Sequence, residues 1–449
     1  MEEKPLYKPE TDKIRSRLIV KNVIASFLVK GWSAIVVLLM VPLSLKCLGI
    51  YQNGVWLTIS SLLVWLDHMD IGLGNGLRNR LTAHVAHDEM KEARMVVSST
   101  LVMLACIVVP IIICIIPLIW LTDVYGFLNV DPSIIPELRI ALTAAVILVC
   151  MTFVMKLISN VYMGMQLPAV SNLLMALGQT ISLLGTWGAY ISGHATFFAI
   201  VIINTASPLI VYFLAYPYTF IRKFPALRPS LKYVKLSSTL ELGNLGIKFF
   251  WLQIAGVIQF MTANLLISNF FSPTMVTPYQ IAYRYMSIVM VFFTVVCMPF
   301  WNATTDAYER NDIKWIKNSN RKMNWMTLCI AILLLLMVAV SPWIYQIWIG
   351  DACDVPFGMT IMMALYILLL ILSMRYSYFL SGIGALRLQL YMTIMTVIFI
   401  PAAYIVSHLT HDILWFMAVM CICVAPSVIV HMIQLHKILD NKATGIWKI

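Results

Sequence analysis

Residues 54–81, GVWLTISSLLVWLDHMDIGLGNGLRNRL, pass from an apolar half into a half with two aspartates, three alternating glycines and two arginines. Closely spaced glycines can let a backbone wrap a phosphate. The spacing here is G-x-G-x-G, however, which differs from the dinucleotide pattern G-x-G-x-x-G, and no strand is predicted before it. The apolar half instead fits a membrane span, with Arg78 and Arg80 anchoring its cytoplasmic end.

The composition of the whole chain agrees with this interpretation. Of the 449 residues, 61% are hydrophobic and only 11% are charged, whereas soluble domains carry about 25% charged residues. The first 22 residues are polar and of mixed charge, without the apolar core of a signal peptide. We therefore expect an integral membrane protein whose first span acts as its own insertion signal.

Apolar runs of about 20 residues, bounded by polar turns, predict twelve spans. The pair around Gly193 is ambiguous, because a single re-entrant hairpin would have a similar pattern. The predicted spans lie near 22–45, 50–75, 96–120, 137–157, 164–191, 195–218, 243–269, 277–301, 324–349, 357–381, 386–407 and 412–436.

Lysine and arginine predict the orientation. All the loop lysines and arginines except Lys46 fall in one alternating set of loops and in the two terminal segments. The positive-inside rule therefore places both termini in the cytoplasm, in a multi-pass membrane protein. The formal net charge of +11 is explained by this topology and by attraction to anionic membrane lipids, so we expect no nucleic-acid partner.

The nine cysteines suggest no metal or redox site. Most of them fall inside predicted spans, and no C-x-x-C or Cys/His spacing occurs. We expect them to be small buried hydrophobic residues, and we expect no cofactor, metal or catalytic residue.

The chain contains a weak internal repeat. A shift of about 223 residues places Trp56 on Tyr279 and Asn79 on Asn302, and in each half a long basic loop follows a pair of spans. Six spans per half make the repeat parallel, about an axis along the membrane normal. The expected parts are a cytoplasmic N-terminal segment 1–21, an N-lobe 22–218, a linker 219–242, a C-lobe 243–436 and a cytoplasmic tail 437–449.

The region 48–100 resembles the signature of the Wzx-type polysaccharide (O-antigen) flippases. These belong to the multidrug/oligosaccharidyl-lipid/polysaccharide (MOP) exporter superfamily, together with MATE drug exporters and lipid II flippases. The pattern is a Leu-Gly before a tyrosine and a Gly-x-Trp, followed by Asp-x-Gly-Leu and an asparagine. The matching residues are Leu48, Gly49, Tyr51, Gly54, Trp56, Asp70, Gly72, Leu73 and Asn79.

The resemblance implies an all-α membrane protein with about twelve transmembrane helices in two six-helix lobes around a central cavity. It also implies a monomeric, non-enzymatic flippase of the bacterial inner (plasma) membrane, which moves an undecaprenyl-pyrophosphate-linked oligosaccharide from the inner to the outer leaflet by alternating access. Its partners would be this lipid-linked glycan, membrane lipids and a polysaccharide polymerase or other assembly proteins.

Several positive side chains lie within the predicted spans, and a pyrophosphate needs such partners when it leaves water. Lys30 and Arg284 are the strongest candidates, because each shares a helical stripe with other polar residues, as Arg284 does with Gln280. Helix-end residues such as Arg139 and Lys156 are better explained by snorkelling to the headgroups. The predicted substrate-binding residues of the cationic cavity are Lys30, Lys248, Arg284 and Arg375.

Asp67, Asp70 and Arg78 are the predicted cavity acids or gate residues at the end of span 2. Lys30 and Arg284 could instead form structural ion pairs with Asp67 or Asp70. The main alternative function is a MATE-like antiporter for drugs or metabolites, which a buried carboxylate in each half would favour. A membrane enzyme such as a sugar polymerase is less compatible, because no predicted loop contains a separated pair of carboxylates.

Overall fold

The computed structural model describes residues 12–67, 73–235, 262–385 and 387–447. Within these ranges the chain contains helices and no strand. Contacts divide it into two compact units. Unit 1 comprises Met1–Gln52 and Ile59–Ile254, and unit 2 comprises Asn53–Thr58 and Ala255–Ile449.

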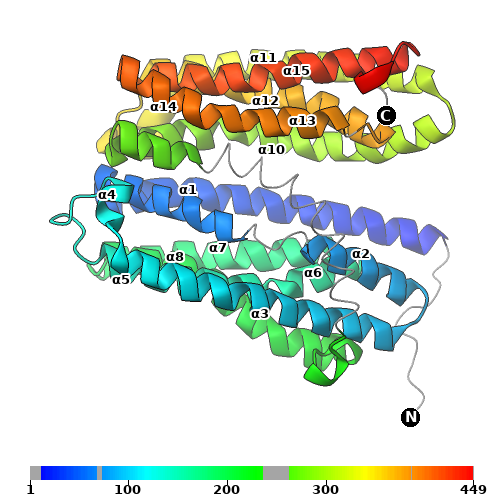
Figure 1. Cartoon of the computed structure of the whole chain (residues 1–449), viewed down its shortest axis with the longest axis horizontal. Coiled ribbons are helices and arrows are strands. Elements are labelled where there is room, and N and C mark those ends of the chain that lie inside the picture. The colour runs from blue at the N-terminus through cyan, green and yellow to red at the C-terminus, as the bar shows by residue number, and fades with distance from the viewer. Residues whose placement is uncertain (1–11, 68–72, 236–261, 386, 448–449) are drawn as a thin grey trace. The chain divides into compact units, whose positions relative to one another are not determined.

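In unit 1, α5 and α7 pack against α8, and α2 packs against α3 and α6 (Figure 1). A segment of short turns follows α8 and packs across the N-terminal part of α3. The elements that contribute to unit 1 are α1 (Asp12–Asp67), α2 (Leu73–Ala86), α3 (Met90–Leu121), α4 (Val124–Leu128), α5 (Leu138–Met155), α6 (Leu157–Gly164), α7 (Pro168–Ile191), α8 (Phe197–Pro217), η1 (Tyr218–Lys223), η2 (Pro225–Leu227) and η3 (Leu231–Tyr233).

In unit 2, α12 is central and packs against α10, α15 and α11, while α14 packs along α15 (Figure 1). The elements are α10 (Pro273–Glu309), α11 (Ile313–Ile349), η4 (Gly350–Ala352), α12 (Phe357–Ile383), α13 (Arg387–Met395), η5 (Thr396–Ile398), α14 (Phe399–Thr410), α15 (Ile413–Leu439) and η6 (Gly445–Trp447).

Nine helical stretches of the described residues are long and apolar enough to cross a membrane, so the chain is a multi-pass membrane protein. The region around Gly193 forms two such helices, α7 and α8, rather than one hairpin. The count of twelve spans stays a prediction. The predicted spans 22–45 and 50–75 share one helical stretch, most of 243–269 lies outside the described residues, and α10, which covers 277–301, is not among the nine. The nine are Ile24–Leu66, Met90–Leu121, Leu138–Gly164, Pro168–Ile191, Phe197–Lys223, Ile313–Ala352, Phe357–Ile383, Arg387–Thr410 and Ile413–Leu439.

The two halves of α1 meet at Gly49, where the backbone leaves helical geometry (φ 67°, ψ 179°). A positive φ with extended ψ is accessible almost only to glycine, because a Cβ would clash with the backbone. The first two predicted spans, 22–45 and 50–75, fall on either side of this residue. The Leu-Gly of the sequence motif therefore marks the break between two helical segments.

Gly54 allows a close approach within unit 2, to which residues 53–58 of α1 belong. A Cβ on Gly54 would lie 1.8 Å from the carbonyl oxygen of Pro273, at the start of α10. The neighbouring Asn53 donates a hydrogen bond from Nδ2 to Thr277 Oγ1 at 3.3 Å. Only glycine fits at position 54 without displacing one of the two backbones.

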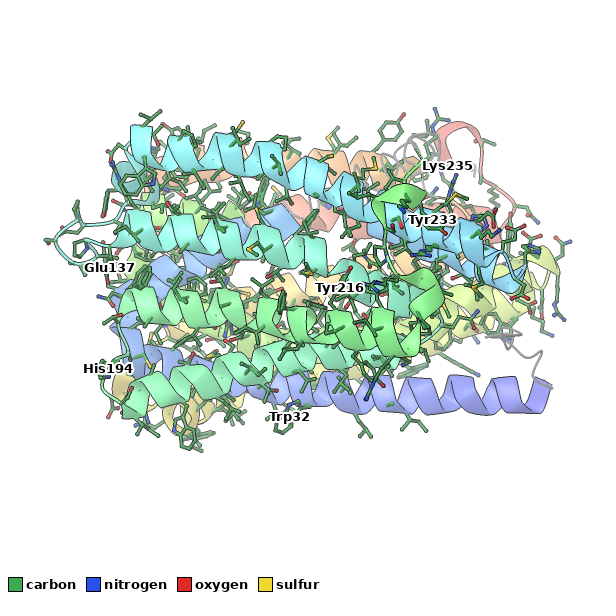
Figure 2. The ribbon with its side chains drawn as sticks, turned by 90° about the horizontal axis from the view of Figure 1, so that it is seen from below. Trp32, Glu137, His194, Tyr216, Tyr233 and Lys235 are labelled. Carbon is green, nitrogen blue, oxygen red and sulfur yellow. The ribbon has the colours of Figure 1, made fainter. Side chains whose placement is uncertain are left out.

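In unit 1 the basic and acidic connections lie at opposite ends of the helices. Figure 2 shows Glu137 and His194 at one end and Tyr233 and Lys235 at the other. The acidic loop between α3 and α5 thus lies opposite the basic segment that follows α8. This separation agrees with the predicted topology, and the assignment of the basic end to the cytoplasm stays a prediction.

In unit 2 an ion pair joins α11 to the residue that ends α15. Lys317 Nζ lies 2.7 Å from Asp440 Oδ1, and both side chains are about half exposed. The Lys317 ammonium lowers the pKa of the Asp440 carboxyl below its usual value, first by the hydrogen bond and then by its charge. The folded state therefore favours the ionised carboxylate.

We predict that Gly54→Ala destabilises the protein by about 1–3 kcal/mol, because the added methyl group must displace α10 or α1. The melting midpoint of the purified protein in detergent measures this effect. Gly31→Ala is the matched control, since no atom lies within 4 Å of a Cβ there and alanine favours a helix. Equal midpoints for the two variants would contradict the close contact at Gly54.

We also predict that Asp440→Asn lowers the melting midpoint slightly at pH 7 and by less as the pH falls below the ordinary aspartate value of about 4. A lowered carboxyl pKa stabilises the fold above the ordinary aspartate value of about 4, and this contribution disappears as the pH falls through the lowered value. The effect is small because the pair is solvent-screened. Asp354→Asn, at an exposed carboxylate without an ion pair in the described residues, is the control. If the difference in melting midpoint between Asp440→Asn and the unsubstituted protein grew as the pH fell, the lowered pKa of Asp440 would be contradicted.

Candidate functional site

Arg284 is a partly exposed arginine in the middle of α10. Its backbone carbonyl accepts a hydrogen bond from Ser287 Oγ at 3.2 Å, but its guanidinium makes no hydrogen bond or ion pair with any other described residue. Five N–H donors on a permanent cation are thereby left for another partner. In a membrane protein, such a charge usually marks a substrate or ion pathway.

The face of α10 that contains Arg284 is polar over two turns. Thr277, Gln280 and Arg284 are spaced i, i+3, i+7 and so lie on one side of the helix. Gln280 Nε2 donates to Asn264 Oδ1 at 2.7 Å, and Asn53 bonds to Thr277. We call these three residues the α10 polar face. The predicted stripe through Gln280 and Arg284 thus exists.

Asn264 and Asn53 hold the α10 polar face in place. Asn264 Nδ2 donates to the carbonyl oxygen of Leu57 at 3.2 Å, and both asparagines are buried. The Asn53 Oδ1 atom is buried and has no hydrogen-bond partner in the described part of the chain. The network fixes the polar face through neutral amides, and the only formal charge on that face is Arg284.

Arg375 is almost fully buried, with 2% of its surface exposed. Its Nη2 donates to the backbone oxygen and to Oδ1 of Asn320, at 3.3 and 2.5 Å, which ties α12 to α11. The guanidinium also lies 4.5 Å from the ring centre of Tyr376. These contacts favour a structural role, and substrate binding by Arg375 stays a prediction.

Lys30 is exposed on α1 and forms no ion pair within the described residues. Trp32, two residues further on, donates from Nε1 to Thr180 Oγ1 of α7 at 3.0 Å and is shown in Figure 2. Residues two apart point to opposite sides of a helix. Lys30 therefore faces away from α7. It belongs to unit 1, whereas Arg284 belongs to unit 2.

The remaining predicted site residues receive less support from the structure. Arg78 is exposed on α2. Asp67 is the last residue of α1, and the structure describes its backbone but not its side chain. Lys248 and Asp70 lie outside the described residues. Whether Asp67 or Asp70 pairs with Lys30 or Arg284 therefore stays open.

Arg139, in the first turn of α5, binds carbonyl groups at the end of α3, while its snorkelling to the headgroups stays a prediction. Its guanidinium donates to the carbonyl oxygens of Trp120 and Thr122, at 3.3 and 3.2 Å, where α3 ends. These carbonyls have no partners within their own helix, and a cation there also interacts favourably with the helix dipole. Arg139 is therefore accounted for without a substrate.

A buried polar cluster that was not predicted from the sequence lies between α12, α13 and α15. Ser373 Oγ lies 3.5 Å from His431 Nδ1, and Ser377 Oγ donates to Gln389 Oε1 at 3.0 Å. Gln434 is fully buried, and neither of its polar atoms has a partner in the described part of the chain. The signal was available, because His431 and Gln434 are spaced i, i+3 on one face of α15.

The described residues contain no group of three His, Cys, Asp or Glu side chains placed to hold a metal ion. All nine cysteines are free thiols, and five of them are exposed or partly exposed outside the buried core: Cys47, Cys106, Cys114, Cys329 and Cys423. Burial within the protein is thus found for Cys150, Cys297, Cys353 and Cys421, whereas the other five lie on helix surfaces.

The fold matches solved structures of transporters. The chain aligns with the inward-facing conformation of a multidrug resistance MATE family transporter of the MOP superfamily, with a TM-score of 0.73 and 15% identity over 93% of this chain and 96% of that one. The outward-facing conformation of a MATE family transporter aligns with a TM-score of 0.66 and 14% identity, over 94% of this chain and 96% of that one. A MOP superfamily transporter from Pyrococcus furiosus aligns with a TM-score of 0.63 and 14% identity, over 96% of each chain.

No family model matches the sequence, and no curated protein matches it either. At identities of 14–15% the structural similarity establishes the fold alone. The predicted fold class is confirmed, because the chain is an all-α membrane protein with the architecture of the MATE transporters of the MOP superfamily.

Proposed function

We propose that this chain is a flippase that moves an undecaprenyl-pyrophosphate-linked oligosaccharide from the inner to the outer leaflet of the plasma membrane. The observation that carries the proposal is the guanidinium of Arg284 on the α10 polar face, which has no hydrogen-bond or ion-pair partner among the described residues. The resemblance of residues 48–100 to Wzx-type flippases supports it. The inward-facing and outward-facing forms of the similar MATE transporters support alternating access as the mechanism.

A pyrophosphate headgroup makes this use of an arginine physically reasonable. Its charges must leave water, and an uncompensated charge in an apolar medium costs far more than transport can supply. A guanidinium offers two parallel N–H donors that match two phosphate oxygens. Arg284 therefore provides both charge and orientation, while the neutral amides around Gln280 keep the site from pairing internally.

The alternative is a MATE-like antiporter that exports cationic drugs or metabolites. Such cargo requires an acidic site within the membrane. In the described residues, the acidic side chains lie in loops or in the terminal turns of helices. The Pyrococcus furiosus transporter is described as having a binding pocket of reverse polarity that suggests a different function, so pocket charge is the property that separates the two proposals.

We predict that Arg284→Ala abolishes export of the surface polysaccharide in the native host at wild-type protein levels in the membrane. Arg284→Lys should retain part of the activity, because an ammonium keeps the charge and loses the two-pronged geometry. The matched control is Arg321→Ala, which removes an exposed arginine of α11. Normal export by Arg284→Ala would rule out the proposed role of this residue.

We further predict that Gln280→Glu impairs export about as strongly as Arg284→Ala, whereas Gln280→Leu impairs it less. Residues four apart on a helix are neighbours, so a carboxylate at position 280 would pair with Arg284 and occupy its donors. Leu keeps approximately the volume and only removes the hydrogen bond to Asn264. The measurement is polysaccharide export at matched protein levels, and a Leu variant that is worse than the Glu variant would contradict an anionic cargo.

A further inference from the structure

We propose that residues 218–235, which we call the strap, form a binding surface for anionic phospholipid headgroups. The strap follows α8 directly and comprises η1, η2 and η3. Its first part, η1, is the end of the membrane-crossing stretch Phe197–Lys223, so the rest of the strap leaves the membrane there, beside the bilayer surface. This proposal is independent of the transported substrate.

Buried side chains fix the inner side of the strap to unit 1. Phe220, Phe224 and Leu227 are buried, and Phe224 packs edge-on against Tyr162 of α6, with ring centres 5.8 Å apart. The Tyr162 hydroxyl also bonds to Thr219 Oγ1 at 3.1 Å. The strap is thus a packed part of the fold.

The first turns of α3 hold the strap backbone at three further points. Arg94 Nε donates to the carbonyl oxygen of Arg228 at 2.7 Å, and its guanidinium lies 4.2 Å from the ring centre of Tyr233. The backbone N–H groups of Ser230 and Lys235 donate to Ser98 Oγ and Ser99 Oγ, both at 3.1 Å. Figure 2 shows Tyr233 and Lys235 close together at this end of unit 1.

The outer side of the strap combines exposed apolar and basic side chains. Leu231 has 82% of its surface exposed, and Tyr218 and Ile221 are also exposed. The strap contains no acidic residue. Its exposed basic residues are Arg222, Arg228, Lys232 and Lys235.

Apolar side chains interleaved with cations match the interface of a bilayer that contains anionic lipid. Each lysine or arginine near such a surface is attracted by its negative potential, and Leu231 and Ile221 can enter the boundary between headgroups and acyl chains. An acidic soluble partner would explain the charges and leave the exposed leucine unexplained. The fixed backbone strengthens the surface, because no ordering entropy is lost when lipid binds.

The test places the photo-crosslinker p-benzoylphenylalanine at position 231 of the full-length protein. The purified protein is reconstituted in vesicles of equal amounts of phosphatidylglycerol and phosphatidylcholine, and mass spectrometry identifies the lipid adducts after illumination. We expect phosphatidylglycerol adducts to exceed phosphatidylcholine adducts by about threefold or more, and the ratio to approach one in about 1 M salt.

A charge-neutralised strap, with Arg222→Gln, Arg228→Gln, Lys232→Gln and Lys235→Gln, should also bring the ratio close to one. The matched control neutralises four basic residues of unit 2, Arg310, Lys314, Arg321 and Lys322, and should leave the ratio high. Absence of lipid adducts at position 231, or a ratio that neither salt nor strap neutralisation changes, would overturn the proposal. The salt arm uses the unneutralised protein, so the test stands even if the fourfold variant fails to fold.

Discussion

Burying a polar group in a bilayer is costly unless the group is paired, and this constraint organises the structure. Helices satisfy the backbone internally, so side chains present the remaining problem. Arg375 is satisfied in part, by two hydrogen bonds from Nη2 to Asn320 and an aromatic ring beside it, while its Nε has no partner in the described part of the chain. Arg139 donates from Nη1 and Nη2 to the carbonyl oxygens of Trp120 and Thr122, at the C-terminal end of α3. Arg284, in the middle of α10, has no such partner among the described residues, and this contrast is the basis of the functional proposal.

Neutral groups obey the same constraint around Arg284. The Asn53 amide donates to the Thr277 hydroxyl, and the Asn264 amide donates to the backbone carbonyl of Leu57. The Gln280 amide donates to the side-chain oxygen of Asn264. They place a polar face on α10 without adding a carboxylate that would neutralise the arginine. Gly54 allows α1 to approach α10 closely enough for these bonds to form.

Local sequence patterns predicted much of this arrangement. Hydropathy predicted the helices, and the i, i+4 spacing predicted that Gln280 and Arg284 share a face. Gly49 and Gly54 were recognised as motif residues, but their roles depend on a backbone angle and on the distance to α10. Sequence could not assign Arg375 to Asn320, because the two residues are 55 positions apart and meet only through the packing of α11 on α12. The cluster of His431 and Gln434 was visible as a spacing and was missed because neither residue is charged.

The central claim is that the site around Arg284 binds an anion, and ligand-induced stabilisation tests it most directly. The melting midpoint of the purified protein would be compared with undecaprenyl pyrophosphate, with undecaprenol and with a cationic dye of the kind that drug exporters bind. The account predicts that only the pyrophosphate raises the midpoint and that Arg284→Ala removes this shift. Stabilisation by the cationic dye, with none by the pyrophosphate, would contradict it and favour the antiporter.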